Sequence, residues 1–399
     1  MARGLPSNDG DATTGPDQEL TGTVIVGAGL AGLGVAETLR RLGYTEPVTL
    51  IGAEKHEPYS RPPLSKEVLR GQADISTATL RKPGELAASG IELRSGRAAA
   101  GLDVDSRQVT LDDGSTLGYE HVVIATGAVP RRLPGAAFDN AHVLRTIDDC
   151  LDLRTHVVGG ESVAIVGAGF IGLEVAASAR ARDCPVTVTD LLPAPLARVL
   201  PPEVGRVVRQ LHEDNGVVFR LGEPVDSDTQ LDADAVVVGI GALPDTAWLD
   251  DSGLTIDNGL VCDASLRAAP GVWAVGDVAR WARPSGALVR IEHWTNATEH
   301  AHAVANNIAN GTSEPFESVP YFWSDQYDAK LQSLGFTSAT DDFEVVWGSL
   351  DEPKWVALLS SGGQLTGVVG MRAPGRVMKT RPLLAAGASY DEALAQFAG

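Results

Sequence analysis

The chain has 399 residues, of which 44% are hydrophobic and 21% charged, which excludes a disordered or fibrous protein and indicates two or three domains. Its net charge of −20 offers no basic footprint for nucleic acid, and no uncharged run is longer than the 17 residues of Leu20 to Ala36, which is too short and glycine-rich for a membrane span. The three cysteines, Cys150, Cys184 and Cys262, form no CxxC pair, which argues against a metal ribbon or redox dithiol and fits a cytoplasmic location.

The ordered part of the chain begins with a strand–turn–helix–strand pattern. Residues 1–20 contain no apolar segment, so we expect a disordered tail there rather than a signal peptide. Residues 23–26 are apolar and β-branched, as in a buried parallel strand. The turn Gly27-Ala-Gly-Leu-Ala-Gly32 follows, and then a helix over 33–42 and a strand over 47–51. A GxGxxG turn in this context binds a dinucleotide pyrophosphate at the helix N-terminus.

The same pattern returns about 140 residues later. A strand at 162–166 leads into Gly167-Ala-Gly-Phe-Ile-Gly172, a helix over 174–182 and a strand over 186–189. Short apolar strands that close near a glycine follow each unit, at 122–127 and 236–241, and a third lies at 272–277. We therefore predict an α/β fold with two Rossmann-like dinucleotide-binding domains, the second nested in the first.

A third, C-terminal domain completes the predicted organisation. Residues 321–347 and 355–371 alternate aliphatic and polar side chains between glycine turns, which indicates an antiparallel sheet, and residues 381–397 read as helical. The last domain is therefore α+β. The expected boundaries are 21–127 with 244–318 for the first domain, 128–243 for the second and 319–399 for the third.

Two dinucleotides in one chain imply electron transfer from a nicotinamide to a flavin. An acid after the second strand of each unit, Glu54 and Asp190, would accept hydrogen bonds from ribose hydroxyls. Asp190 would repel a 2′-phosphate and is followed by two leucines, which favours NADH, although Arg198 leaves NADPH open. The longer bed for FAD suits the first unit, which continues into residues 58–66 and is completed by Asp277.

Several further segments together resemble one family. They are Tyr59-Ser-Arg-Pro-Pro-Leu-Ser-Lys66, Ile171-Gly-Leu-Glu-Val175, Gly239-Ile-Gly-Ala-Leu-Pro244, Ala274-Val-Gly-Asp277, Ile291-Glu-His-Trp294 and Phe322-Trp-Ser-Asp-Gln-Tyr327. From Thr23 to Leu334 the chain resembles the FAD-dependent NAD(P)H:ferredoxin reductases of the putidaredoxin reductase type. It is more distantly similar to apoptosis-inducing factor and to disulfide reductases, whose redox cysteine pair it lacks.

The resemblance implies a catalytic ion pair, Lys66 with Glu174, beside the flavin. We expect FAD to contact Gly27, Gly29, Leu30, Ala31, Gly32, Ala53, Glu54, Arg61, Lys66, Ala99, Ala125, Thr126, Gly127, Arg145, Asp277 and Trp294. We expect NADH to contact Gly167, Gly169, Phe170, Ile171, Gly172, Glu174, Asp190, Arg198 and Gly241. Members of the family often carry Asp in place of Ala53, so the ribose contact falls to Glu54 or to water. The alternative for Lys66 and Glu174 is an ion pair that only stabilises the fold.

An electron exit is expected near the C-terminal domain. A helix over 295–310 would direct its positive N-terminus at the reduced flavin. Tyr321 and Trp323 are candidates for an exposed aromatic rim, and a docking patch for an acidic iron–sulfur ferredoxin is expected at Arg372, Arg376, Lys379 and Arg381, a run without acids. Arg81-Lys82 and Arg131-Arg132 are other candidate patches. The alternatives are sheet-core aromatics and an ordinary solvated face. The histidine spacing predicts no metal site.

These patterns predict an NADH-dependent FAD-containing ferredoxin reductase, in which hydride passes to FAD and single electrons pass to a ferredoxin. The resemblance implies a cytochrome P450 or a ring-hydroxylating oxygenase as the final acceptor, and no nucleic-acid or membrane partner is expected. Two alternatives remain. An NADH oxidase would usually carry a cysteine beside the flavin, and a redox-signalling protein of the apoptosis-inducing factor type would bind both cofactors but turn over slowly.

Overall fold

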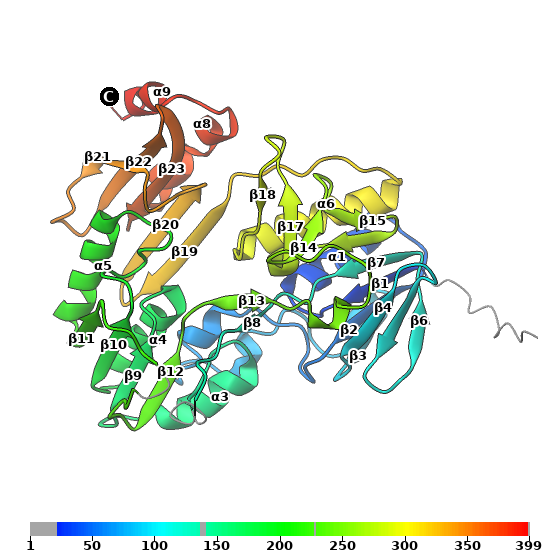
Figure 1. Ribbon diagram of the computed structural model, residues 1–399, viewed down its shortest axis with the longest axis horizontal. Helices are drawn as coiled ribbons and strands as arrows, with labels where there is room; N and C mark the ends of the chain where they lie inside the picture. The colour runs from blue at the N-terminus through cyan, green and yellow to red at the C-terminus, as the bar shows by residue number, and fades with distance from the viewer. Residues whose placement is uncertain (1–21, 136–140, 227–228, 398–399) are drawn as a thin grey trace, which may run out of the picture.

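A six-stranded sheet forms the centre of the first dinucleotide-binding domain in the computed structural model, which describes residues 22–135, 141–226 and 229–397. The strand order is β15-β16-β7-β1-β2-β3 (Figure 1). The strands are β15 (Arg267–Ala269), β16 (Val272–Ala274), β7 (His121–Ile124), β1 (Thr23–Val26), β2 (Val48–Gly52) and β3 (Glu92–Ser95). All neighbours are parallel except β15 and β16. The chain thus returns to this sheet at β16 after it has built the second domain, which confirms the predicted nesting.

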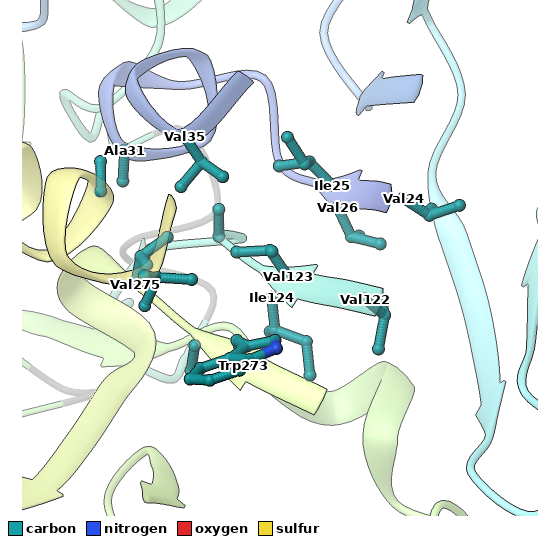
Figure 2. Packing of buried hydrophobic residues seen from close by; sticks show 14 of the residues in the cluster. Val24, Ile25, Val26, Ala31, Val35, Val122, Val123, Ile124, Trp273 and Val275 are labelled. Atoms are coloured by element: carbon teal, nitrogen blue, oxygen red, sulfur yellow. The ribbon is translucent and has the colours of Figure 1, made fainter. Parts of the chain in front are cut away.

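The core of this domain is buried on both faces of the sheet. Val24, Ile25 and Val26 are successive residues of β1 and all are buried, as expected of a covered parallel strand. Two helices, α1 (Leu30–Arg41) and α6 (Trp294–Asn310), pack against each other and supply side chains to this core. Figure 2 shows Ala31 and Val35 of α1 beside the valines of β1 and β7, with Trp273 of β16 in the same cluster.

Smaller elements surround the central sheet. Two three-stranded sheets are formed by β4 (Ala99–Asp103), β5 (Gln108–Leu111) and β6 (Thr116–Gly118), and by β14 (Leu260–Cys262), β17 (Ala279–Ala282) and β18 (Leu288–Val289). The short helices are η1 (Pro62–Ser65), η2 (Ile75–Thr77), α2 (Glu85–Ala88), η4 (Ala247–Leu249) and η5 (Gly276–Val278).

The second domain contains a four-stranded parallel sheet in the order β11-β10-β9-β12. Its elements are α3 (Ile147–His156), β9 (Val163–Val166), α4 (Phe170–Arg180), β10 (Val186–Asp190), α5 (Pro202–Asp214), β11 (Val217–Leu221) and β12 (Ala235–Val238). The chain enters and leaves it through β8 (Ala128–Pro130) and β13 (Ala242–Pro244), which pair antiparallel. The predicted domain boundaries fall beside these two strands and stay predictions.

The C-terminal domain is built on a five-stranded antiparallel sheet in the order β19-β20-β23-β22-β21, as expected. The strands are β19 (Tyr321–Gln326), β20 (Ala329–Gly335), β21 (Asp342–Gly348), β22 (Trp355–Ser361) and β23 (Gln364–Met371). Three short helices follow, α7 (Pro374–Lys379), α8 (Arg381–Ala385) and α9 (Tyr390–Ala395). Figure 1 shows β19 and β20 extending from this domain toward α4 and α5 of the second.

Two expectations about helices were wrong. The helices predicted from residues 33 and 174 begin earlier, at Leu30 and Phe170, because the glycine turns themselves form the first helical turn. The helix predicted over 381–397 is two helices, because Gly387 adopts a left-handed conformation and a capping box at Ser389 starts a new helix. The predicted tail over 1–20 lies outside the described residues, and none of the helices described is long and apolar enough to cross a membrane.

Candidate dinucleotide and redox site

One cavity of about 1610 Å³ joins the two glycine turns of the first and second domains. It extends to the start of α6 and to β19 of the C-terminal domain. Every predicted cofactor-binding residue lines it except Gly32, and so do both members of the predicted ion pair. The predicted residues on its wall are Gly27, Gly29, Leu30, Ala31, Ala53, Glu54, Arg61, Lys66, Ala99, Ala125, Thr126, Gly127, Arg145, Asp277, Trp294, Gly167, Gly169, Phe170, Ile171, Gly172, Glu174, Asp190, Arg198 and Gly241.

The glycine turns present backbone N–H groups to the cavity. Gly29 and Gly169 are the N-caps of α1 and α4, and no side chain of the described residues caps either helix start. A Cβ built on Gly29 would meet nothing within 4 Å, so the approach to the first turn is open. Gly32 lies behind the wall, where a Cβ would be 1.9 Å from the carbonyl oxygen of Gly27. Its role is therefore close packing of helix on strand, and both helix N-termini are left free to bind anions.

Glu54 is held by two residues of the following loop. Its Oε1 accepts a hydrogen bond from Arg61 Nη2 at 3.0 Å, and its Oε2 accepts one from the Tyr59 hydroxyl at 2.5 Å. Burial raises the pKa of Tyr59, which keeps the phenol a donor. Each carboxylate oxygen retains acceptor capacity toward the cavity, which Glu54, Tyr59 and Arg61 all line. Tyr59 was not among the predicted site residues, although it opens the segment that carries the family resemblance.

Asp190 joins the end of β10 to the second glycine turn. Its Oδ2 accepts from the backbone N–H of Ala168 at 2.6 Å, and its Oδ1 accepts from that of Leu192 at 2.8 Å. The neighbouring Leu191 is 61% exposed, and Arg198 is an exposed cation on the same wall. The carboxylate is thereby fixed in orientation beside the turn, at an open rim of the cavity.

Asp277 is clamped by two arginines. Arg145 Nη2 donates to Asp277 Oδ2 at 2.9 Å, and Arg290 Nη1 donates to the Asp277 carbonyl oxygen at 3.0 Å. The Nε atoms of both arginines are buried without a partner among the described residues. His300 Nδ1 accepts from the Gly276 N–H at 3.2 Å, and burial lowers the pKa of His300 to about 3, so the ring stays neutral. Sequence reasoning missed Arg290, which directly precedes the Ile291–Trp294 segment of the resemblance.

The predicted pairing of Lys66 with Glu174 is present. Lys66 Nζ lies 2.6 Å from Glu174 Oε2, and the two side chains are 12% and 5% exposed. Two hydroxyls also donate to this carboxylate, Ser65 Oγ to Oε2 and Ser324 Oγ to Oε1, each at 2.6 Å. The pair therefore meets the condition for a tolerated buried ion pair, since its remaining lone pairs are satisfied.

Two tryptophan rings, those of Trp294 and Trp323, also line the cavity. Trp294 is 39% exposed and lies edge-on to Trp323 with ring centroids 6.1 Å apart. Trp323 in turn stacks on Tyr321 with ring centroids 5.9 Å apart. Because Tyr321 does not line the cavity, the row of three rings leads away from it. His293, the N-cap of α6, also lines the wall, and burial lowers its pKa to about 4.

The basic residues predicted as a docking patch do not stand alone. Arg372 forms an ion pair with Asp328, and Arg381 pairs with Glu299 at 2.8 Å. The guanidinium of Arg376 lies 4.2 Å over the Trp347 ring, and Lys379 is exposed. The run has no acid in its sequence, but other elements bring acids to it. Its use for docking stays a prediction.

The thiols give no sign of redox chemistry. Cys150, Cys184 and Cys262 are all buried and free. Burial raises the pKa of Cys150 to about 11. Among residues 22–135, 141–226 and 229–397, no group of three or more His, Cys, Asp or Glu side chains is arranged to hold a metal ion.

Comparison with known proteins agrees with this geometry. Residues 21–301 match the family "Pyridine nucleotide-disulphide oxidoreductase", and residues 321–396 match "Reductase C-terminal". The chain is 37% identical to rhodocoxin reductase of Rhodococcus erythropolis, over 91% of this chain and 89% of that protein. It is 38% identical to the ferredoxin–NAD(+) reductase component of the anthranilate 1,2-dioxygenase system of Burkholderia cepacia, over 92% of this chain and 95% of that protein.

The fold also matches solved structures. The reductase in the crystal structure of a covalent putidaredoxin reductase–putidaredoxin complex superposes with a TM-score of 0.87 at 33% identity, and the match covers 94% of this chain and 98% of that one. Two nested dinucleotide-binding domains, the C-terminal sheet and these matches agree over nearly the whole length. The chain belongs to the pyridine nucleotide-disulphide oxidoreductase family.

Proposed function

We propose that the chain is an NADH-dependent, FAD-containing ferredoxin reductase, with FAD in the first domain and NADH in the second. The observation that carries this proposal is the single cavity of about 1610 Å³ onto which both glycine turns and the Lys66–Glu174 pair open. Pockets for drug-sized ligands measure about 300–1,000 Å³, so this one has room for two dinucleotides. The relatives support the proposal, since one is a ferredoxin–NAD(+) reductase component and another forms a complex with putidaredoxin.

The donors and acceptors in the part of the cavity formed by the first domain fit FAD. The uncapped N–H groups at the start of α1 would bind the pyrophosphate. Glu54 would accept from the ribose, and Asp277, held by Arg145 and Arg290, would accept from the sugar-alcohol chain. Trp294 would form a wall of the ring site.

The part of the cavity formed by the second domain fits NADH. The open start of α4 would bind the second pyrophosphate, and Asp190, fixed by two backbone N–H groups, would accept from the adenosine ribose. A carboxylate at this place repels a 2′-phosphate, which supports NADH over NADPH. Arg198 is the cation on this wall that would weaken the preference.

The protein's part in the reaction is to orient the two cofactors and to place charge beside them. When bound, NADH supplies a hydride, and FAD accepts it and passes electrons on singly. Lys66 holds a positive charge on the cavity wall, and Glu174 compensates that charge where water is excluded. The N-terminus of α6 opens on the same wall and favours negative charge there by about 0.3–2 kcal/mol. Trp323 and Tyr321 continue outward from Trp294 and would form the rim at which a carrier docks.

The proposed electron acceptor is an iron–sulfur ferredoxin that serves a cytochrome P450 or an oxygenase, in the cytoplasm. The assay is anaerobic stopped-flow absorbance with NADH, followed by addition of a [2Fe–2S] ferredoxin and cytochrome c. Fast flavin bleaching followed by ferredoxin-dependent cytochrome reduction is expected. Rapid oxygen consumption without a carrier would favour an NADH oxidase, and a persistent charge-transfer band without onward transfer would favour a signalling protein.

Two glycine variants test which cofactor occupies which turn. Added Cβ atoms would lie 1.9 Å from the Gly27 carbonyl oxygen in Gly32→Ala, and 2.1 Å from the Gly167 carbonyl oxygen in Gly172→Ala. Gly32→Ala should purify without flavin, whereas Gly172→Ala should keep flavin but lose bleaching by NADH. Gly375→Ala, where a Cβ meets nothing within 4 Å, is the control. The reverse pattern would exchange the two cofactor assignments.

A further inference from the structure

A buried chain of hydrogen bonds runs from the C-terminal domain to the carboxylate of Glu174. The Tyr327 hydroxyl lies 3.2 Å from His212 Nδ1, and His212 Nε2 lies 2.9 Å from Gln326 Oε1. Gln326 Nε2 donates to Ser324 Oγ at 3.1 Å, and Ser324 Oγ donates to Glu174 Oε1 at 2.6 Å. Because the Gln326 amide donates to Ser324, its oxygen must accept from His212 Nε2–H, which leaves His212 Nδ1 to accept from Tyr327. Every donor in the chain therefore points toward Glu174.

The hydrogen-bond chain crosses the boundary between the second and the C-terminal domain. Glu174 lies on α4 and His212 on α5 of the second domain, whereas Ser324, Gln326 and Tyr327 belong to the β19–β20 hairpin. Strand β19 of this hairpin packs against α4, and Figure 1 shows the hairpin extending toward both helices. On the other side of the same carboxylate, Ser65 and Lys66 of the first domain donate to Oε2. All three domains thus meet at Glu174, and among the described residues only Ser324 of the C-terminal domain donates to Oε1.

Burial makes each link of the chain matter. His212, Gln326 and Ser324 are 0%, 2% and 1% exposed, so water cannot replace a lost partner. Burial lowers the pKa of His212 to about 4, so its ring is neutral and acts as one donor and one acceptor. Hydrogen bonds that align in a low-dielectric interior polarise one another, so the chain strengthens its last bond, the one to the carboxylate.

The Gln326 amide, in the middle of the hydrogen-bond chain, distinguishes a proton relay from a fixed hydrogen-bond support. A proton relay requires every member to accept a proton at one atom and release one at another. Gln326 does not meet that requirement, since its amide would have to become an imidic acid. The chain is therefore a fixed electrostatic support and not a route for protons.

We propose that Ser324, Gln326 and His212 are positioning residues for the Glu174 carboxylate. They hold Oε1 so that Oε2 faces Lys66, and in this way the C-terminal domain completes the ion pair at the cavity wall. The inference rests on the proposed function, in which this pair lies beside the flavin. Strand β19 then has two roles, because it places Trp323 on the cavity wall and Ser324 against the Glu174 carboxylate.

The test compares three single variants of the full-length holoprotein. Ser324→Ala removes the last donor, and Ser324→Thr keeps a hydroxyl at that place. Ser333→Ala is the matched control, because Ser333 is 1% exposed on the neighbouring strand β20 and its hydroxyl has no partner among the described residues. Two readouts are taken, which are the rate of anaerobic flavin bleaching by NADH and the acetylation of Lys66 by N-hydroxysuccinimidyl acetate relative to the exposed Lys379, measured by mass spectrometry.

A hydrogen bond to a charged group is strong enough that Ser324→Ala should slow bleaching by about tenfold and raise Lys66 acetylation about threefold. Ser324→Thr should restore both readouts, and Ser333→Ala should match the wild type. Wild-type values for Ser324→Ala in both readouts would overturn the inference, and so would equal effects of Ser324→Ala and Ser333→Ala. If NADH fails to bleach the wild type, the proposed function fails, whereas Lys66 acetylation still decides the positioning role.

Discussion

The buried pair of Lys66 and Glu174 should be strongly coupled in stability. Among the described residues, Glu174→Leu leaves the Lys66 ammonium with the Pro62 carbonyl oxygen at 3.2 Å and the Ser65 hydroxyl at 3.4 Å as its remaining partners. Removal of one partner of a buried ion pair costs about 3–5 kcal/mol, because the other charge is left without compensation. With a side-chain exposure of 12%, water gives Lys66 little relief. Lys66→Met alone should be similarly destabilising, because the buried Glu174 carboxylate then has its two serine donors but no cation to compensate its charge.

The size of the effect in a thermal experiment follows from the chain length. Unfolding entropy of about 2.1 cal/mol/K per residue means that 1 kcal/mol shifts the midpoint of a chain this long by about 1.2 °C. Each single variant should therefore lower Tm by about 4–6 °C. The double variant Lys66→Met/Glu174→Leu should lose much less than the sum, because it buries no unpaired charge.

Scanning calorimetry of the four proteins with saturating FAD measures this coupling. The four proteins form a double-mutant cycle. Both proteins with Glu174→Leu lose the hydrogen bonds from Ser65 and Ser324, so this loss cancels in the coupling energy. The exposed i,i+4 pair of Arg209 and Glu213 supplies the control cycle, for which a coupling of about 0.3–0.5 kcal/mol is expected. Additive Tm changes in the buried pair would refute the reasoning, since the two charges would then not depend on each other.

Three further predictions concern specificity, acid stability and docking. Asp190→Ser should reduce the preference in kcat/KM for NADH over NADPH, and an unchanged ratio would remove Asp190 from the ribose site. Burial holds the pKa of His212 at about 4 and that of His300 at about 3, against about 6.5 in the unfolded chain. Below pH 6.5 only the unfolded state takes up these protons, so each histidine should cost about 2 kcal/mol of stability by pH 5; a Tm equal at pH 5 and 7.5 would contradict this. Reversal of Arg376 and Lys379 to Glu should raise KM for the ferredoxin at low salt and less at 0.5 M, and no change at low salt would exclude this surface from docking.

The sequence by itself determined the two dinucleotide-binding units. A GxGxxG turn is a local pattern, because a strand, a tight turn and a helix start must follow one another within a few residues. Both turns, their flanking strands and the return of the chain at β16 are visible in residue order. The antiparallel C-terminal sheet was also predicted, since alternation of apolar and polar side chains is again a property of consecutive residues.

Tertiary structure alone decided how charges and hydroxyls meet. Arg372 and Arg381 lie in an acid-free run, yet Asp328 and Glu299 reach them from 44 and 82 residues away. Ser324 binds a carboxylate 150 residues earlier in the chain. A hydrogen bond acts over about 3 Å and depends on direction, so it forms only where domain packing brings its two groups together. Periodicity describes the faces of one element and contains no information on which other element those faces will meet.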